Sequence, residues 1–302
     1  MARRREHLAA IDVGTNAARL KIARHRSGRL DVVHSDRAAV EPGEGVFDRG
    51  VMTRAAVDRL CAALSDFADA CRFHRADVRA VATSAVRSAR NRDAVIARVR
   101  REAGVQLEVI DGLEEARLTA LGVLAGAEGD ERSLCIDIGG GSTEIMLSEG
   151  EDLVKAHSVD VGGVRLQQRV GHDLPALRKF AHEQLGALPA RLGRRWMGED
   201  ATAIGCSGSV RALVDFATSE ARRYLTRAEL SSAVEELARM KPEHRARFFG
   251  RRAHVALPVA VILEQTMERL GLWAVRATRR GLRDGLLVEL SRARRERLRL
   301  AS

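Results

Sequence analysis

The stretch Leu134–Ser148, LCIDIGGGSTEIMLS, decides the fold of this 302-residue chain. An apolar strand ends in an acid and runs into three glycines, two hydroxyl residues and a second acid. These residues are Asp137, Gly139, Gly140, Gly141, Ser142, Thr143 and Glu144. Glycine adopts backbone angles that other residues resist and lets main-chain N–H groups approach an anion, while carboxylates are ligands that Mg²⁺ takes beside phosphates. The stretch predicts a strand–loop–strand that binds phosphate, with a glycine-rich hairpin turn as the alternative.

The same plan occurs near the N-terminus, in residues 11–22, IDVGTNAARLKI. Here a strand ends in Asp12, and Gly14, Thr15 and Asn16 form the loop before the next strand. The two motifs are far enough apart for each to open a domain of its own. Two hairpins that each carry an acid at the turn, one in each of two tandem domains, predict a cleft that binds one phosphate chain from both sides.

Hydrophobic periodicity predicts the order β-β-β-α-β-α-β-α for the first segment and a similar start for the second. In the first we expect strands at 8–14, 19–26, 30–35, 78–82 and 105–110 and helices at 53–72, 91–103 and 112–126. In the second we expect strands at 134–139, 144–147, 153–161, 202–205 and 274–278 and helices at 174–196, 209–218, 227–239, 255–270 and 282–300. The boundary falls at the acidic turn 126–131, which gives an N-terminal domain of residues 1–126 and a C-terminal domain of residues 127–302 with extra helices. Two such units predict the duplicated actin-like, ribonuclease-H-type α/β fold with an interdomain cleft.

The composition excludes several classes of protein. No apolar run is long enough for a transmembrane helix, and the N-terminus lacks a secretory pattern. The four cysteines show no metal-binding spacing, so we expect buried free thiols and a cytoplasmic protein. A net charge of +10 attracts polyanions, although a general preference for arginine explains it equally well. Aromatic residues make up only 3% of the chain, which argues against a stacking platform for nucleic acid.

Two further residues are candidates for chemistry. Glu115 lies at the start of a helix and, with Thr119, points away from the apolar stripe, so it could activate a water molecule. The alternative is that it only complements the helix dipole, as acids in a first helical turn often do. Arg87 follows a strand and could bind phosphate, or it could be an ordinary surface arginine. The segments 162–165 and 205–209 each predict either an anion site or a plain turn or helix cap. The expected inner stripe of the helix 112–126 consists of Leu113, Ala116, Ala120, Leu121 and Leu124.

Taken together, these motifs resemble the exopolyphosphatase/guanosine pentaphosphate phosphohydrolase family. The resemblance is carried by DVGTNAARL (12–20), ATSAVR (82–87), GLEEARL (112–118), DIGGGSTE (137–144), GGVRL (162–166) and GLRDGLL (281–287). It implies the two-domain actin-like fold, dependence on Mg²⁺ with a monovalent cation such as K⁺ as a further candidate, and a homodimer. It also implies release of the terminal phosphate from a phosphate chain.

The resemblance assigns roles residue by residue. Glu115 matches the acid that activates water, and Asp12, Asp137 and Glu144 match the acids that hold the metal or order the attacking water. The phosphate-cradling positions are matched by Gly14, Thr15, Asn16, Arg87, Gly139, Gly140, Gly141, Ser142 and Thr143. The chain departs from the family at Ala17, where serine is usual, and at His254 and Arg279, where acids are usual.

We therefore expect a cytoplasmic, Mg²⁺-dependent exopolyphosphatase that removes terminal orthophosphate from inorganic polyphosphate, with guanosine pentaphosphate as a second substrate. The alternatives are an actin-like ATPase or kinase and a catalytically weak protein that binds polyanions. No membrane partner and no nucleic acid partner are expected.

Overall fold

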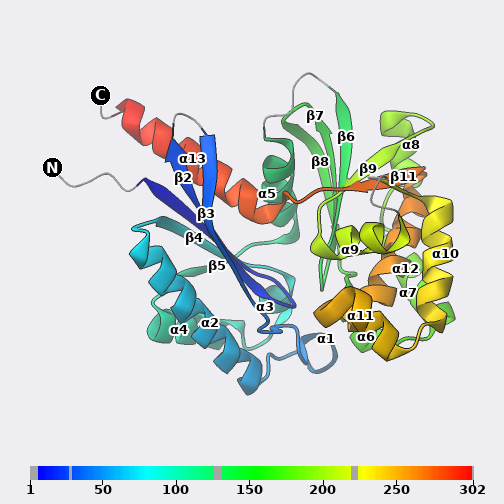
Figure 1. The fold of residues 1–302 in the computed structure, drawn as a ribbon, viewed down its shortest axis with the longest axis horizontal. Helices are drawn as coiled ribbons and strands as arrows, with labels where there is room; N and C mark the ends of the chain where they lie inside the picture. The colour runs from blue at the N-terminus through cyan, green and yellow to red at the C-terminus, as the bar shows by residue number, and fades with distance from the viewer. Residues whose placement is uncertain (1–5, 27–28, 126–130, 219–223, 301–302) are drawn as a thin grey trace. The chain divides into compact units, whose positions relative to one another are not determined.

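The computed structural model describes residues 6–26, 29–125, 131–218 and 224–300. The chain divides into two compact units, each with its own β-sheet (Figure 1). The first unit joins residues 1–125 to residues 282–302, and the second holds residues 126–281. Residues 126–130 of the predicted boundary turn lie outside the described part of the chain. No helix in the described ranges is long and apolar enough to cross a membrane.

The five-stranded sheet of the first unit has the order β3-β2-β1-β4-β5. Short connections pair β1, β2 and β3 as antiparallel neighbours, whereas connections through helices make β4 and β5 parallel to β1. The central strand β1 is buried along its whole length after His7. The strands are β1 (His7–Val13), β2 (Ala18–Arg26), β3 (Arg29–Ala38), β4 (Asp77–Ala82) and β5 (Leu107–Val109).

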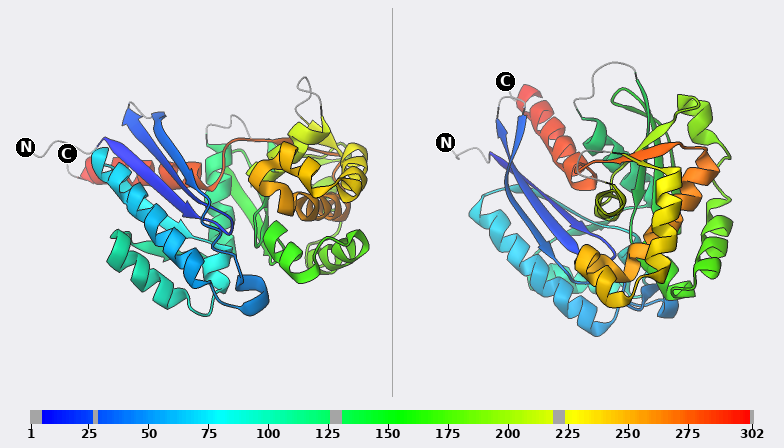
Figure 2. Two further views of the ribbon diagram at one scale, coloured as in Figure 1. Left: turned by 60° about the horizontal axis from the view of Figure 1, so that its bottom comes forward. Right: turned by 45° about the vertical axis from the view of Figure 1, so that its right-hand side comes forward.

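Helices cover both faces of this sheet (Figure 2). Ile11 of β1 lines a pocket together with Cys71 of α2, so α2 lies on one face. Leu8 of the same strand shares a core cluster with Leu118 of α5 and Leu286 of α13, which places these two helices on the other face. The alternation follows from the pleat of β1. The helices of this unit are α1 (Val46–Arg49), α2 (Arg54–Phe73), α3 (Ser84–Ser88), α4 (Arg92–Ala103), α5 (Gly112–Leu124) and α13 (Leu282–Leu300).

The last helix, α13, corrects the predicted domain assignment. We expected residues 282–302 to belong to the second domain because they follow it in the chain. Instead, Leu282 and Leu286 are buried in the core cluster of the first unit. Gly285 permits close contact between helices, because a Cβ there would lie 1.8 Å from the carbonyl oxygen of Leu118 in α5. An amphipathic stripe shows that a helix buries one face but not which core receives it.

The burial of α5 also differs from the prediction. Leu113 was expected on the inner stripe but is 57% exposed, whereas Leu118 and Thr119 are fully buried. The reason is that α13 packs along α5 and buries positions that a single stripe facing the sheet would leave exposed. The second packing partner comes from a distant part of the chain, so local periodicity could not reveal it.

The six-stranded sheet of the second unit has the order β10-β11-β9-β6-β7-β8. It repeats the plan of the first: β6, β7 and β8 form an antiparallel meander, while β9 runs parallel to β6 and β11 parallel to β9. A short antiparallel strand, β10, forms the outer edge. The strands are β6 (Arg132–Ile138), β7 (Thr143–Glu149), β8 (Asp152–Val159), β9 (Thr202–Gly205), β10 (Tyr224–Thr226) and β11 (Ala274–Ala277).

The helices of the second unit pack around α12, in which every residue from 255 to 264 is buried. The single helix predicted over 174–196 is two helices, because α7 ends at Leu185, before its C-cap Gly186, and Arg191 takes a left-handed backbone conformation with φ of 55°. The helix α6 was not predicted. The helices are α6 (Gly163–Val170), α7 (Leu174–Leu185), α8 (Leu192–Met197), α9 (Gly208–Ala217), α10 (Arg227–Arg239), α11 (Pro242–Phe249), a 3₁₀ turn (Gly250–Arg252) and α12 (Ala253–Leu270).

Candidate functional site

The first predicted site lies at the turn between β1 and β2. Asp12 and Arg19 are direct partners across these antiparallel strands, so their side chains share one face of the sheet. Nη1 of Arg19 lies 3.5 Å from Oδ2 of Asp12, and Asp12 is buried. Gly14 N donates to the carbonyl of Ala17 at 3.1 Å and closes the turn. Asp12 is therefore an ion-paired carboxylate at the start of a tight turn.

The peptide groups of this turn have a defined orientation. Gly43 N donates to the carbonyl of Thr15 at 2.8 Å, and Glu41 N donates to the carbonyl of Asn16 at 3.3 Å. In a trans peptide the C=O and the following N–H point in opposite directions. The N–H groups of Asn16 and Ala17 consequently point away from the segment that holds the carbonyls. The turn can offer main-chain donors to an anion, as predicted for a phosphate loop.

The second hairpin, between β6 and β7, places two acids opposite each other. Asp137 and Glu144 are direct cross-strand partners, and Glu144 is 1% exposed. The hydroxyl of Ser158 donates to Oε1 of Glu144 at 2.8 Å. Like charges directly opposite each other in a sheet repel, and burial strengthens the repulsion. A divalent cation between the carboxylates would remove this cost.

These two acids fit Mg²⁺. Mg²⁺ is usually bound through one or two carboxylates, while waters and substrate phosphates complete its coordination. The described residues contain no group of three or more His, Cys, Asp or Glu side chains that could hold a metal ion. Two carboxylates can hold Mg²⁺ when waters and substrate oxygens supply its other ligands, so a Mg²⁺ site here needs no third side chain of these types.

The glycine loop between these strands is an anion cradle. The carbonyls of residues 139–141 accept hydrogen bonds of 2.7–3.0 Å from the first residues of α6 and from Nε of Arg165. Because the peptides are trans, the N–H groups of residues 140–142 point away from α6. Within the described ranges, none of these three N–H groups donates a hydrogen bond. Three unsatisfied main-chain donors beside two carboxylates suit a phosphate with its metal ion.

Neighbouring residues hold this loop in place. A Cβ on Gly162 would lie 2.5 Å from the nitrogen of Gly141, so glycine is required there by close packing. The hydroxyl of Thr143 donates to the carbonyl of Val161 at 2.6 Å. We expected this hydroxyl to be a phosphate donor, but its hydrogen fixes the loop. Arg165, predicted either near a phosphate or in a turn, also supports the loop by binding its backbone.

Glu115 and Arg87, predicted separately, are in contact. The side chain of Asp111 caps α5, so Glu115 lies in its first turn. Nη1 of Arg87 donates to the carbonyl of Ile110 at 2.8 Å and lies 3.3 Å from Oε2 of Glu115. Glu115 is 9% exposed. The arginine thus orients the carboxylate while the rest of its guanidinium remains able to meet a phosphate oxygen.

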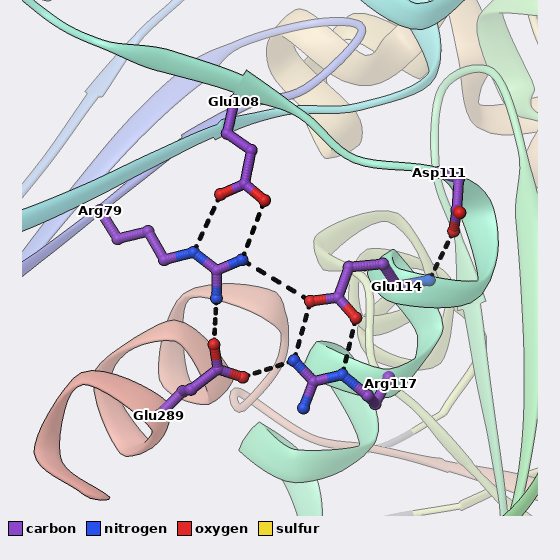
Figure 3. Close-up of polar contacts among 6 residues, drawn as sticks. All are labelled: Arg79, Glu108, Asp111, Glu114, Arg117 and Glu289. Atoms are coloured by element: carbon purple, nitrogen blue, oxygen red, sulfur yellow. Dashed lines mark hydrogen bonds and ion pairs between the residues drawn. The ribbon is translucent and has the colours of Figure 1, made fainter. Parts of the chain in front are cut away.

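An ion-pair network fixes the first turns of α5 from outside (Figure 3). Arg117 holds Glu114 through both carboxylate oxygens, at 2.6 and 2.8 Å. Glu289 of α13 accepts hydrogen bonds from Arg117 and from Arg79 of β4, and Arg79 also binds Glu108 of β5 at 3.1 and 3.2 Å. The network joins two strands and two helices, and it anchors the helix that carries the candidate base.

Arg283 of α13, which was not among the predicted site residues, lies beside the first hairpin. Its Nη1 donates to the carbonyl of Leu20, next to Arg19, at 3.2 Å. The following residue, Asp284, pairs with Lys21 at 2.7 Å. Burial lowers the pKa of Arg283, the charge of Arg19 lowers it further, and the charge of Asp12 opposes them. The string GLRDGLL was noticed as a motif, but only the packing of α13 places its arginine near Asp12.

The turn at residues 205–209 is a helix cap. The side chain of Ser207 accepts a hydrogen bond from Val210 N at 3.0 Å. This is the helix cap that the sequence analysis gave as the alternative to an anion site. Beside it, a hydrogen bond with Cys135 and burial both raise the pKa of the Cys206 thiol. All four cysteines are buried and free, as predicted.

Comparison with known proteins identifies the family. The model of the Ppx/GppA phosphatase family matches residues 21–293. The chain belongs to the Ppx/GppA phosphatase family. It is 34% identical to exopolyphosphatase 2 of Mycobacterium tuberculosis over 94% of this chain and 98% of that protein. It is 31% identical to exopolyphosphatase 1 of Mycobacterium bovis over 93% of this chain and 87% of that protein.

Solved structures agree with this family assignment. The crystal structure of an exopolyphosphatase from Cytophaga hutchinsonii matches with a TM-score of 0.82 and 26% identity, over 94% of this chain and 97% of that one. The fold is the two-sheet, actin-like α/β fold predicted from the duplicated hairpins. The predicted site residues of this Ppx/GppA member fall into two groups. Asp12, the first loop, Arg87 and Glu115 belong to the first unit, and residues 137–144 belong to the second.

Proposed function

We propose that this protein is an exopolyphosphatase that hydrolyses the terminal phosphoanhydride bond of inorganic polyphosphate with the help of Mg²⁺. The observation that carries the proposal is the second hairpin. It combines two opposed carboxylates with three outward N–H groups, and these are the parts needed to hold a metal ion and a phosphate together. The identity to two exopolyphosphatases over nearly the whole chain supports the same reaction.

The proposed mechanism uses the predicted site residues. Glu115, held by Arg87, accepts a proton from a water molecule whose oxygen attacks the terminal phosphorus. The bond from that phosphorus to the bridging oxygen breaks, and orthophosphate and a chain shorter by one phosphate leave. The N–H groups of residues 140–142 bind the equatorial oxygens as charge develops on them. Asp137 and Glu144 would hold Mg²⁺, which supplies positive charge to the phosphate oxygens when bound, and Asp12 orders the water or the substrate.

The test is phosphate release from long polyphosphate, short polyphosphate, guanosine pentaphosphate and ATP by wild type, Glu115→Gln and a control. Glu296→Gln is the control, because Glu296 is an exposed acid on α13 and lies outside the site. We expect Glu115→Gln to lower kcat on polyphosphate by about 10²–10⁴-fold and to leave polymer binding intact, since a general base contributes this much. The control should match wild type.

Other outcomes would replace the proposal. Tight polymer binding without phosphate release in wild type would indicate a polyanion-binding protein. Faster turnover of ATP than of polyphosphate would indicate an ATPase or kinase.

Guanosine pentaphosphate is a second candidate substrate. The chain is 32% identical to a guanosine-5'-triphosphate,3'-diphosphate pyrophosphatase of Photobacterium profundum over 68% of this chain but only 42% of that longer protein. The same release assay compares this substrate with polyphosphate.

A further inference from the structure

A groove of about 1010 Å³ opens within the second unit, apart from the predicted site residues. Its walls come from α7, α8, the start of α10 and the end of α12, together with the segment that leads into β11 (Figure 1). Pockets that bind small molecules have volumes of roughly 300–1,000 Å³. The groove is therefore large enough to hold a whole small-molecule ligand.

The groove and the glycine loop lie at opposite edges of the same sheet. The strands β9 and β11 are parallel, and Ala277 lies beside Gly205 at their carboxyl ends. The strand β6 is also parallel to β9, and Ile136, the residue before Asp137, lies beside Gly205. Asp137 and its loop are therefore at the carboxyl edge of these strands, whereas Trp273 of the groove precedes β11 at the amino edge. A ligand in the groove would leave the glycine loop open.

Two arginines of the groove have no acidic partner. The described residues that line it include four arginines and three glutamates. Two of these arginines are neutralised by two of these glutamates, in the ion pairs Arg178–Glu264 and Arg194–Glu199. The other two, Arg191 and Arg227, are exposed, and neither forms an ion pair within the part of the chain that the structure describes. The groove thus presents two unpaired guanidinium groups, which attract an anion.

An exposed tryptophan lies next to one of these arginines. Trp273 is 46% exposed, and its ring contacts that of Tyr224 with the centroids 5.4 Å apart. Its N–H donates to the carbonyl of Ala201 at 2.9 Å, and its carbonyl accepts a hydrogen bond from the N–H of Arg227 at 3.0 Å. These bonds fix the backbone from which both side chains enter the groove. An accessible aromatic ring is a surface on which a flat heterocycle can stack.

The second arginine is held close to the same segment. Arg191 has a φ of 55°, in the left-handed region that favours glycine, and its N–H donates to the carbonyl of Arg269 at 2.7 Å. A Cβ on Gly193 would lie 2.4 Å from Cδ2 of Leu272, the residue before Trp273, so α8 packs tightly against this segment. The backbone around the groove therefore holds an arginine and an aromatic ring near each other.

We propose that this groove binds a nucleoside phosphate, with the base stacked on Trp273 and the phosphate groups bound by Arg191 and Arg227. The planar guanidinium group matches the geometry of phosphate oxygens. An inorganic phosphate would not use the aromatic ring, and a purely apolar ligand would not use the arginines. Ser231 and Gln265 also line the groove and can form hydrogen bonds with ribose hydroxyls. The site is separate from the catalytic one and does not rest on the proposed function.

Titration calorimetry in EDTA tests the proposal with ADP, adenosine and pyrophosphate as probes. We expect ADP to bind at least tenfold more tightly than either of its parts. Trp273→Ala should raise the Kd for ADP by about 5–150-fold, the contribution of one base stacked on an aromatic ring. Arg191→Gln and Arg227→Gln should each raise it at least fivefold. Arg195→Gln is the matched control and should stay within twofold, because Arg195 is an exposed arginine of α8 outside the groove.

Tryptophan fluorescence reports on the groove directly. The chain has two tryptophans, and the other one, Trp196, lies outside the groove lining and donates to the carbonyl of Ser133 at 3.1 Å. In a Trp196→Phe variant Trp273 is the only tryptophan, so ADP should quench its fluorescence with the Kd measured by calorimetry. A Trp273→Phe variant should show no such change. Absence of a saturable change in the Trp196→Phe variant would overturn the proposal, as would pyrophosphate binding as tight as that of ADP.

Two further variants separate the groove from the glycine loop and from misfolding. Gly162→Ala alters the loop and should bind ADP like wild type; loss of ADP binding there, with wild-type affinity in Trp273→Ala, would place the nucleotide at the loop and refute the groove. If Trp273→Ala does not fold, the exposed Arg191 and Arg227 decide, and wild-type affinity in both glutamine variants would refute the site. A wild-type protein that binds ADP in the groove but releases no phosphate from polyphosphate would overturn only the proposed hydrolase.

Discussion

Replacing Gly285 by alanine tests the contact that joins α13 to α5. The added Cβ would lie 1.8 Å from the carbonyl oxygen of Leu118 and 2.7 Å from its carbonyl carbon, whereas ordinary contact begins at 3.4 Å. The obstructing atoms belong to the backbone, so no side chain can rotate to make room. The two helices would have to separate by about 1.6 Å, the difference between the ordinary and the actual distance.

Two opposing effects set the size of the change. Alanine favours the helix by about 1 kcal/mol over glycine. Separation of the helices opens space beneath Leu282 and Leu286, which are buried against the sheet, and loosening such packing costs about 3–5 kcal/mol. The net expectation is a loss of about 2–4 kcal/mol in the free energy of unfolding of the first unit.

The assay is chemical denaturation followed by circular dichroism, together with hydrogen exchange of peptides from α5 and α13. Faster exchange should be confined to these two helices and the strands they cover. Arg295→Ala is the control, since this residue is exposed on the same helix. A Gly285→Ala variant within 1 kcal/mol of wild type, with unchanged exchange in α5, would refute the contact.

Four further outcomes follow from the contacts described above. Gly162→Ala should weaken tripolyphosphate binding more than tenfold in calorimetry, because its methyl group would meet the glycine loop at 2.5 Å. Glu289→Gln should lower the free energy of unfolding by about 1 kcal/mol or less in urea titrations, because its ion pairs are partly exposed to solvent. Burial raises the pKa of Cys71 to about 11, so a thiol reagent at pH 8 should label it slowly until the protein is denatured. Hydrogen bonds from Arg117 lower the pKa of Glu114 below 4.5. The stability that this carboxylate contributes is therefore complete above pH 4.5 and is lost as the pH falls further. Glu114→Gln should accordingly flatten the acid side of a plot of the free energy of unfolding against pH.

Local signals in the sequence were sufficient for the hairpins and most of the sheet. Both hairpin turns could be predicted because the residues that follow Asp137 and Asp12 are of types with strong backbone preferences. The helix 53–72 was predicted within one residue of α2 because Thr53 caps it and its apolar face is regular. Free buried cysteines followed from their spacing alone.

The missed features depend on contacts between distant residues. Nothing near Leu113 shows that α13 reshapes the burial of α5, and nothing near Thr143 shows that its hydroxyl is committed to Val161. The pairing of Arg19 with Asp12 also needed the strand register, because only the register shows that an arginine lies where the other hairpin has a carboxylate. Short elements such as α1 and α3 carry too few residues for a periodic pattern.

The packing of α13 has a consequence for synthesis of the chain. Residues 126–281 are translated between the first strands and the helix that completes their core. At about 5–20 residues per second, the ribosome needs roughly 8–30 s to make this intervening segment. During that interval Leu8 and Ala10 lack the leucines that cover them in the finished protein. The second unit is contiguous in the sequence, so it can close its core before the first unit does. The unit whose synthesis begins first should therefore finish folding last.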